Sequence, residues 1–282
     1  MPSELLTDAP IGVFDSGLGG LTVVREMLTS LPGERIIYVA DQTHVPYGGR
    51  ELEEVRGFAV SISESLLAWG CKAVVMACNI SSAVALSDVR AAHPDTPALG
   101  VILPGAEAAL AVTENGVVGV LATEGTVRSG AYTLALHAAR PDARVIEVAC
   151  PQFVPLVESG QERTPDARAA TCEYLDPILE AGADTIILGC THYPFLLPIL
   201  EAAAPEMRFI DPAQQAVTAL QTRLGSELLR VSDNFAAPLL ITTGSVRAFA
   251  SQLRRFLPDQ AERAEIRAAV WKNGLLHLTE TA

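Results

Sequence analysis

Two cysteines stand directly after short apolar segments of the sequence. Cys78 follows residues 73–77, and Cys190 follows residues 185–188 and Gly189. A short apolar run rich in β-branched residues is typical of a buried strand. Open α/β sheets place their chemistry at the carboxyl ends of such strands. We therefore predict that the two thiols occupy equivalent positions in two halves of one molecule.

Two thiols on opposite walls of a cleft can invert a carbon centre. A thiolate is a good base as well as a nucleophile, and its pKa falls at a helix N-terminus or beside a cation. One thiolate removes a proton from one face of the carbon, and the other thiol delivers a proton to the opposite face. Each acid–base group of this kind contributes on the order of 10²–10⁴-fold to the rate. The pairing of Cys78 and Cys190 therefore predicts inversion of a stereocentre without a cofactor.

The α-proton of an amino acid is a weak acid, so such a site also needs preorganised donors for the carboxylate and the developing carbanion. Asp15 and His192 each stand beside a predicted substrate contact, and we expect them to tune the nearby thiols. The side chains suited to binding the substrate are those of Ser16, Asn79, Thr126 and Thr191.

A structural role for the cysteines is the alternative interpretation. Free cysteine is among the most often buried residues and packs like a small hydrophobic side chain. We assign that role to Cys71, Cys150 and Cys172. His192 alone can equally be a structural histidine. A hydrolase that pairs Cys190 with His192 is less favoured, because a triad needs a base brought in by the fold rather than one two residues away.

Strands and helices alternate along the chain. We predict strands at residues 11–14, 36–40, 73–77, 98–103, 117–122, 145–149, 185–188, 208–210 and 238–243. The strand at 208–210 is expected to return to the first half of the molecule. We predict helices at residues 21–31, 51–69, 79–90, 105–114, 127–140, 168–181, 214–224 and 245–257.

This alternation predicts an α/β protein with parallel sheets built from βαβ units. We expect two similar domains, each a mostly parallel sheet flanked by helices, with the active site in the cleft between them. The predicted first domain comprises residues 1–100 and 210–282 and carries Cys78. The predicted second domain comprises residues 101–209 and carries Cys190.

Composition and charge limit the partners and the location. The chain has 282 residues, is 49% hydrophobic and carries a net charge of −13, which argues against nucleic acid as a partner. Its five cysteines are odd in number and lack C-x-x-C spacing, so neither a disulfide framework nor a zinc site is indicated. We see no signal peptide and no apolar run of about 18 residues. We therefore expect a cytoplasmic protein that does not act on membranes.

The glycine-rich turn at residues 15–20 lies between a predicted strand and a predicted helix. It presents backbone N–H groups to a ligand. It lacks the last glycine of a dinucleotide fingerprint, because Thr22 stands there, and no Gly-Lys-Ser/Thr follows as in a P-loop. The loop at residues 41–50 mixes turn formers with polar side chains and is the second predicted binding loop. Neither loop indicates a nucleotide cofactor.

Six segments together resemble the glutamate racemases, members of the cofactor-independent aspartate/glutamate racemase superfamily. They are residues 12–23 (GVFDSGLGGLTV), 38–48 (YVAD…PYG), 77–83 (ACNxSSA), 122–127 (ATEGTV), 157–160 (VESG) and 188–194 (LGCTHYP). They occur in order over most of the first 212 residues.

The resemblance implies a two-domain α/β homodimer that interconverts L- and D-glutamate for peptidoglycan, without metal, pyridoxal phosphate or nucleotide. By motif, Cys78 matches the base that acts on D-glutamate, and Cys190 matches the base that acts on L-glutamate. The polar residues that match assistants of the thiols are Asp15, Asp41, Glu158 and His192. The residues that match substrate contacts are Asp15, Ser16, Tyr47, Gly48, Asn79, Ile80, Thr191 and His192.

Two positions depart from the family pattern. Ile80 stands where relatives usually carry threonine, so a hydroxyl is missing although the backbone N–H remains. A site built around a hydrogen bond loses discrimination when the group is absent, and we expect an effect on substrate affinity. His44 stands where relatives usually carry arginine. The interpretation is a glutamate racemase; the alternatives are a racemase of another acidic amino acid such as aspartate, and a non-catalytic binding protein on the same scaffold.

Overall fold

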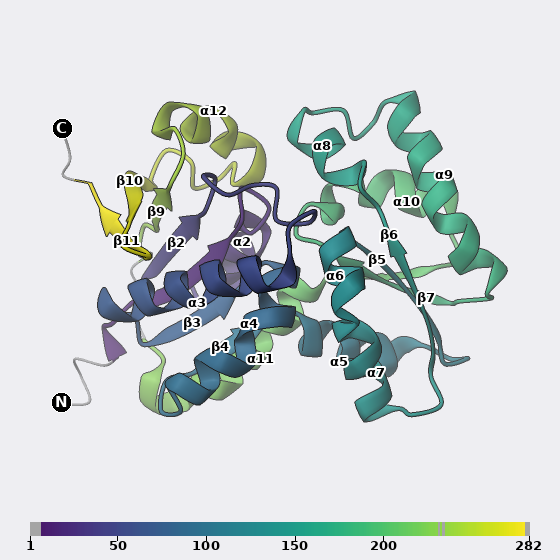
Figure 1. Ribbon diagram of the computed structural model, residues 1–282, viewed down its shortest axis with the longest axis horizontal. Helices are drawn as coiled ribbons and strands as arrows, with labels where there is room; N and C mark the ends of the chain where they lie inside the picture. Colours follow the sequence, from purple (N-terminus) through teal and green to yellow (C-terminus); the bar gives the residue numbers. More distant parts are fainter. Residues whose placement is uncertain (1–6, 231, 233–234, 280–282) are drawn as a thin grey trace.

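The computed structural model describes residues 7–230, 232 and 235–279, whose strands form two sheets side by side (Figure 1). The seven-stranded sheet has the order β11-β10-β9-β2-β1-β3-β4, and the four-stranded sheet has the order β6-β5-β7-β8. Every neighbouring pair is parallel except β10 with β11. Helices flank both sheets, which confirms the predicted fold class.

The larger sheet contains β1 (Ile11–Asp15), β2 (Ile36–Ala40), β3 (Ala73–Met76), β4 (Ala98–Gly100), β9 (Leu239–Thr242), β10 (Glu265–Lys272) and β11 (Leu275–Leu278). The smaller sheet contains β5 (Val117–Ala122), β6 (Arg144–Ala149), β7 (Thr185–Gly189) and β8 (Arg208–Ile210). Helices α2 (Leu21–Ser30), α3 (Leu52–Ala68), α4 (Asn79–Ala92), α11 (Pro212–Leu228) and α12 (Val246–Phe256) lie around the larger sheet. The remaining helices are α5 (Ile102–Val112), α6 (Glu124–Ser129), α7 (Ala131–Ala139), α8 (Phe153–Glu158), α9 (Pro165–Glu180), η1 (Tyr193–Leu196) and α10 (Leu197–Ala203).

The same strand order occurs twice. Strands β1 to β4 are arranged as β2-β1-β3-β4, and strands β5 to β8 are arranged as β6-β5-β7-β8. In each set a cysteine follows the third strand. One residue, Ala77, separates the end of β3 from Cys78, and β7 ends directly before Cys190. In each set the chain reverses direction across the sheet between the first and third strands, where open α/β sheets bind ligands. The repeated strand order therefore places the two cysteines after equivalent strands of the two sheets.

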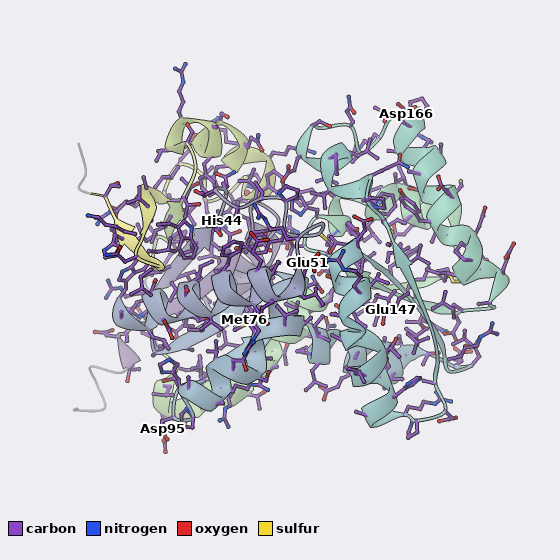
Figure 2. The ribbon with its side chains drawn as sticks, in the orientation of Figure 1. His44, Glu51, Met76, Asp95, Glu147 and Asp166 are labelled. Carbon is purple, nitrogen blue, oxygen red and sulfur yellow. The ribbon has the colours of Figure 1, made fainter. Side chains whose placement is uncertain are left out.

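The central strands are buried on both faces, as parallel strands covered by helices must be. All residues of β1, β3 and β7 are buried. One cluster of buried apolar side chains joins the two halves and includes Leu21 of α2, Leu188 of β7 and Val217 of α11. In Figure 2, Glu51 at the start of α3 lies at the boundary between the halves, and Glu147 of β6 lies within the second half.

Most predicted elements are present, with shifted ends. The predicted strand 98–103 ends at Gly100, and α5 begins at Ile102. The predicted helix 127–140 is two helices, because Gly130 has a left-handed φ of 61° that interrupts the hydrogen-bond ladder. The prediction that residues 208–210 return to the first half is wrong, since β8 pairs with β7. Helices α8, η1 and α10 and strands β10 and β11 were not predicted.

Candidate active site

Both cysteines line one pocket of about 440 Å³ between the two sheets. Of the predicted site residues, all except Asp41 line it. Those that the structure brings together are Asp15, Ser16, Tyr47, Gly48, Cys78, Asn79, Ile80, Thr126, Glu158, Cys190, Thr191 and His192. The unpredicted residues of its wall are Val45, Pro46, Gly49, Thr123, Glu124, Cys150, Pro151, Val154, Pro155 and Gly189.

Cys78 caps the N-terminus of α4. Its extended backbone (φ −66°, ψ 125°) ends the strand segment, and its carbonyl accepts the N–H of Ser82 at 2.9 Å. Burial raises the pKa of the Cys78 thiol to about 12, and the nearby carboxylate of Asp15 adds to the rise. The contact with Ser81 at the helix start acts in the opposite direction. The Cys78 thiol is therefore protonated at neutral pH.

Cys190 lies on the opposite wall, at the end of β7. Its carbonyl accepts the N–H of Tyr193 at 3.0 Å, which starts the short helix η1. Its Sγ lies 3.8 Å from Nδ1 of His192. Burial raises the pKa of this thiol well above its ordinary value, the contact with the backbone of His192 opposes the rise, and Asp15 adds to it. Both thiols thus need a further cation, such as a substrate ammonium group, to ionise readily.

His192 connects Cys190 to Glu158. The Nε2 atom of His192 lies 3.3 Å from Oε1 of Glu158, which comes from the end of α8. This contact holds the pKa of the Glu158 carboxyl below its ordinary value, against the effect of burial. The imidazole is itself buried, with 3% of its surface exposed. Glu158 is therefore an anion at neutral pH that orients the ring beside the Cys190 thiol.

Asp15 is the last residue of β1, and its carboxylate contacts residues of both halves of the protein. Its Oδ2 accepts the N–H of Gly17 at 3.1 Å, and its Oδ1 accepts the hydroxyl of Thr191 at 3.3 Å. Burial raises the pKa of the Asp15 carboxyl, and His192 acts in the opposite direction. The glycine-rich turn makes this approach possible, because a Cβ on Gly19 would lie 2.3 Å from Oγ1 of Thr191. The turn thus lets one half of the protein contact the other.

Asn79 is held by a residue that the sequence did not indicate. The hydroxyl of Tyr132, in α7 of the second half, donates to Oδ1 of Asn79 at 2.7 Å. With its oxygen occupied, Asn79 has its amide NH₂ left as a donor. Tyr132 lies inside a helical sequence pattern, and nothing in its neighbourhood distinguishes it from a core residue. Its role follows only from the fold.

Ile80 forms an apolar part of the pocket wall. Its side chain is buried and reaches Gly125 at the start of α6, where a Cβ would lie 2.2 Å from Cδ1 of Ile80. The same Cβ would lie 3.0 Å from the carbonyl oxygen of Gly48. Ile80, Gly48 and Gly125 therefore pack against one another across the boundary between the sheets, and a side chain at position 125 would require Ile80 or helix α6 to move.

Asp41 does not line the pocket but lies directly behind it. Its carboxylate Oδ2 accepts the hydroxyl of Tyr47 at 2.7 Å. Cys71 and Cys150 are buried and Cys172 is exposed, and none of the protein's five cysteines, all of which lie within the described residues, forms a disulfide. Cys150 also reaches the pocket wall.

Neither a metal site nor a membrane-spanning helix is found within the part of the chain that the structure describes. No three His, Cys, Asp or Glu side chains there are grouped to hold a metal ion. No helix there is long and apolar enough to cross a membrane.

Comparison with known proteins defines the class. The model of the Asp/Glu/hydantoin racemase family matches residues 11–220. The chain belongs to this family.

Within the family, its relatives are glutamate racemases. The glutamate racemase of Ectopseudomonas mendocina is 41% identical over 257 residues, which cover 91% of this chain and 97% of that protein. The glutamate racemase of Desulforudis audaxviator is 45% identical over 245 residues, which cover 86% and 88%. The predicted resemblance and the predicted enzyme class, an isomerase of the glutamate racemase kind, are confirmed.

Solved structures agree with this assignment. A glutamate racemase isoform from Bacillus anthracis superposes with a TM-score of 0.87 at 36% identity, covering 95% of this chain and 99% of that one. The glutamate racemase of Francisella tularensis, solved in complex with D-glutamate, gives 0.86 at 31% identity, covering 94% and 98%.

Proposed function

We propose that this protein interconverts L- and D-glutamate by acid–base catalysis with two thiols. The observation that carries the proposal is that Cys78 and Cys190 line one pocket from different sheets, each at the end of an equivalent strand. A carbon held between them is exposed to one sulfur on each face. The relatives named above act on glutamate, and one was solved with D-glutamate bound.

The reaction moves one proton off the α-carbon and another onto it. With L-glutamate, the Cys190 thiolate takes the α-proton, and the Cys78 thiol gives its proton to the opposite face. The product is D-glutamate, with Cys190 protonated and Cys78 ionised, and the reverse reaction exchanges these roles. The residues assigned to each enantiomer follow the family resemblance.

The substrate itself helps to form the thiolate. Burial keeps both free thiols protonated, as described above. A substrate ammonium group beside a sulfur favours its charged form, because an opposite charge within a few ångströms lowers a thiol pKa. His192 lies between Cys190 and Glu158, with its Nδ1 3.8 Å from the Cys190 Sγ and its Nε2 3.3 Å from Oε1 of Glu158. Asp15 is the buried anion suited to holding the substrate ammonium group.

The carboxylates of the substrate meet neutral donors. The amide of Asn79 and the hydroxyls of Ser16, Thr126 and Thr191 line the pocket. The backbone N–H groups at the start of α4, where Ile80 lies, are further donors at a helix N-terminus, which favours anions. These groups stabilise negative charge as it develops on the α-carbon and its carboxylate.

The test follows optical rotation and proton exchange together. Purified protein is incubated with each enantiomer of glutamate and of aspartate, and circular dichroism is followed to zero. We expect racemisation of glutamate and deuterium uptake at the α-carbon in D₂O. Racemisation of aspartate alone would overturn the substrate. Glutamate binding with no α-proton exchange would establish a non-catalytic binding protein instead.

The wider biological setting is also part of the proposal. D-glutamate is a building block of peptidoglycan, so we propose a role in cell-wall synthesis in the cytoplasm, as a homodimer. We also propose two domains, residues 1–100 with 210–282 and residues 101–209. The division of the strands between the two sheets supports these boundaries.

A further inference from the structure

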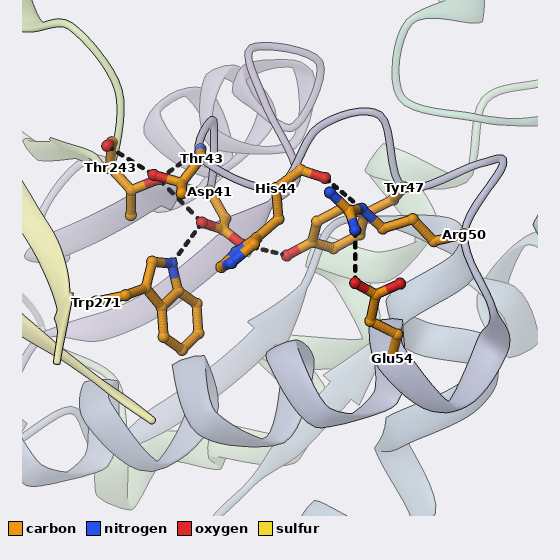
Figure 3. Close-up of polar contacts among 8 residues, drawn as sticks. All are labelled: Asp41, Thr43, His44, Tyr47, Arg50, Glu54, Thr243 and Trp271. Atoms are coloured by element: carbon orange, nitrogen blue, oxygen red, sulfur yellow. Dashed lines mark hydrogen bonds and ion pairs between the residues drawn. The ribbon is translucent and has the colours of Figure 1, made fainter. Parts of the chain in front are cut away.

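The carboxylate of Asp41 is fully buried and accepts hydrogen bonds from four side chains (Figure 3). Its Oδ2 accepts from the hydroxyl of Tyr47 at 2.7 Å and contacts Nδ1 of His44 at 2.8 Å. Its Oδ1 accepts from Nε1 of Trp271 at 2.8 Å and from the hydroxyl of Thr243 at 2.9 Å. These four contacts therefore stabilise the buried carboxylate, although Asp41 does not line the pocket.

Of these four donors, Tyr47 is the one that lines the pocket. Tyr47 is 3% exposed, and its hydroxyl donates to Asp41. Burial raises the pKa of the Tyr47 phenol well above its ordinary value, and the charge of Asp41 adds to the rise. The phenol therefore remains a donor at all working pH values, and its hydrogen bond to Asp41 fixes where the ring stands.

The other side of Asp41 is held by the C-terminal strands. Trp271 lies in β10, and Thr243 follows β9. Thr243 makes two further hydrogen bonds with Thr43. Its hydroxyl oxygen accepts the backbone N–H of Thr43 at 2.9 Å, and its carbonyl oxygen accepts the hydroxyl of Thr43 at 2.8 Å. These bonds join the end of β9 to the loop that carries Tyr47. Trp271 and Thr243 both lie beyond the family match, which ends at residue 220.

We propose that Trp271 and Thr243 are positioning residues for the substrate pocket, which act through the carboxylate of Asp41 on Tyr47. The proposal rests on the proposed function, in that this pocket binds glutamate. It assigns to Asp41 an anchoring role in place of direct assistance to the thiols. Hydrogen bonds to an ionised group are about twice as strong as neutral ones, so loss of one donor changes how the remaining three share the carboxylate.

The packing around Trp271 allows the donor to be removed without removing the ring. The His44 ring stacks on Phe58 with centroids 3.9 Å apart, and Trp271 meets His44 edge-on at 5.0 Å. Trp271→Phe keeps one aromatic ring in this group and removes the indole N–H together with the second fused ring, a loss of ring area that Trp69→Phe reproduces elsewhere. Thr243→Val keeps the shape and removes the hydroxyl, whereas Thr243→Ser keeps the hydroxyl. Trp69→Phe, at the C-terminus of α3, is the matched control.

The experiment separates KM from kcat. For Trp271→Phe and Thr243→Val we expect the KM for glutamate to rise about five- to twentyfold, the range of one lost charge-assisted hydrogen bond that is partly replaced by water. We expect kcat to change by less than about twofold. Thr243→Ser and Trp69→Phe should leave both constants near those of the unchanged protein. Melting temperatures are measured alongside for every variant.

Two results would overturn the proposal. If kcat falls and KM does not, Asp41 acts on the proton transfers rather than on Tyr47. If both constants stay unchanged in Trp271→Phe and Thr243→Val, the two residues serve only the fold.

A fluorescence measurement keeps the proposal independent of the reaction. Trp69→Phe leaves Trp271 as the sole tryptophan. In that background, Tyr47→Phe should shift the Trp271 emission, because both donors share Asp41. This shift needs no glutamate, so it distinguishes failure of the coupling from failure of the racemase function. An unchanged emission overturns the coupling even where the protein racemises glutamate.

Discussion

The hydroxyl of Thr191 donates a hydrogen bond to Oδ1 of Asp15 at 3.3 Å, although Asp15 ends β1 in one sheet and Thr191 follows β7 in the other. The contact joins the two walls of the pocket at their base. It also places a buried carboxylate where two thiols approach, and that carboxylate raises the pKa of both. Burial of the Asp15 carboxylate therefore destabilises its charged form, and a substrate ammonium group beside it would offset this cost.

The first prediction concerns this cost. The folded-state pKa of Asp15 is raised, so the folded protein holds the proton more tightly than the unfolded chain, and stability falls as pH rises through that range. Asp15→Asn removes the charge and keeps the shape. We expect it to be more stable at pH 7 by on the order of 1 kcal/mol, with the difference shrinking near pH 4, while racemisation falls at least tenfold. Calorimetry at both pH values checks this; equal stability at pH 7 contradicts it.

The second prediction concerns the two thiols. Cys78→Ser and Cys190→Ser should each lower racemisation by on the order of 10²–10⁴-fold, because each removes one acid–base group. Cys71→Ser is the control, since Cys71 is buried beside Gly12 and does not line the pocket. Circular dichroism with each enantiomer measures the rates. A damaging Cys71→Ser with an active Cys78→Ser would refute the assignment.

The third prediction concerns pH. The thiol of Cys78 has a pKa of about 12 and that of Cys190 is raised, so the thiolate fraction of the free protein increases up to and beyond pH 9. We expect kcat/KM to rise between pH 6.5 and pH 8.5 by roughly tenfold or more. Because both thiols have raised pKa values in the folded protein, the free energy of unfolding should be unaffected by them at neutral pH and should decline as pH rises above the ordinary thiol pKa. A flat rate profile over this range argues against thiol bases.

The fourth prediction concerns Glu158. Glu158→Gln keeps the side-chain size but removes the negative charge that orients His192 beside Cys190. We expect kcat/KM to fall about tenfold and its dependence on pH near neutrality to change. Glu262→Gln is the matched control, because Glu262 pairs with Arg254 and neither residue lines the pocket. Equal losses in both variants would point to general charge effects.

The fifth prediction concerns the contact between Ile80 and Gly125. Gly125→Ala brings a methyl group to 2.2 Å from Cδ1 of Ile80, so the side chain or helix α6 must shift. We expect a loss of activity of at least tenfold, partly restored when Ile80→Thr is added, since threonine lacks that carbon. Ile80→Thr alone should lower the KM for glutamate. A double-mutant cycle measures the coupling, and strictly additive effects would contradict it.

The sequence was enough to place the two cysteines, because each stands directly after an apolar run that is recognisable as a strand. A residue in that position lies at the carboxyl end of its strand whatever the rest of the fold is. The tyrosine and tryptophan that support the pocket could not be found in this way. Tyr132 meets Asn79, and Trp271 meets Asp41, across large sequence separations that only the fold closes. Strands β10 and β11 were missed because β11 pairs only at the edge of the sheet and both carry many exposed residues.

The repeated strand order has a consequence for kinetics. Mirror-image substrates have equal free energies in water, so the equilibrium constant between them is one, and kcat/KM must be the same in both directions. A substitution in either half must therefore change kcat/KM by the same factor for both enantiomers. A substitution beside one thiol will accordingly slow both directions equally in kcat/KM, even when it acts on the proton transfer of one enantiomer.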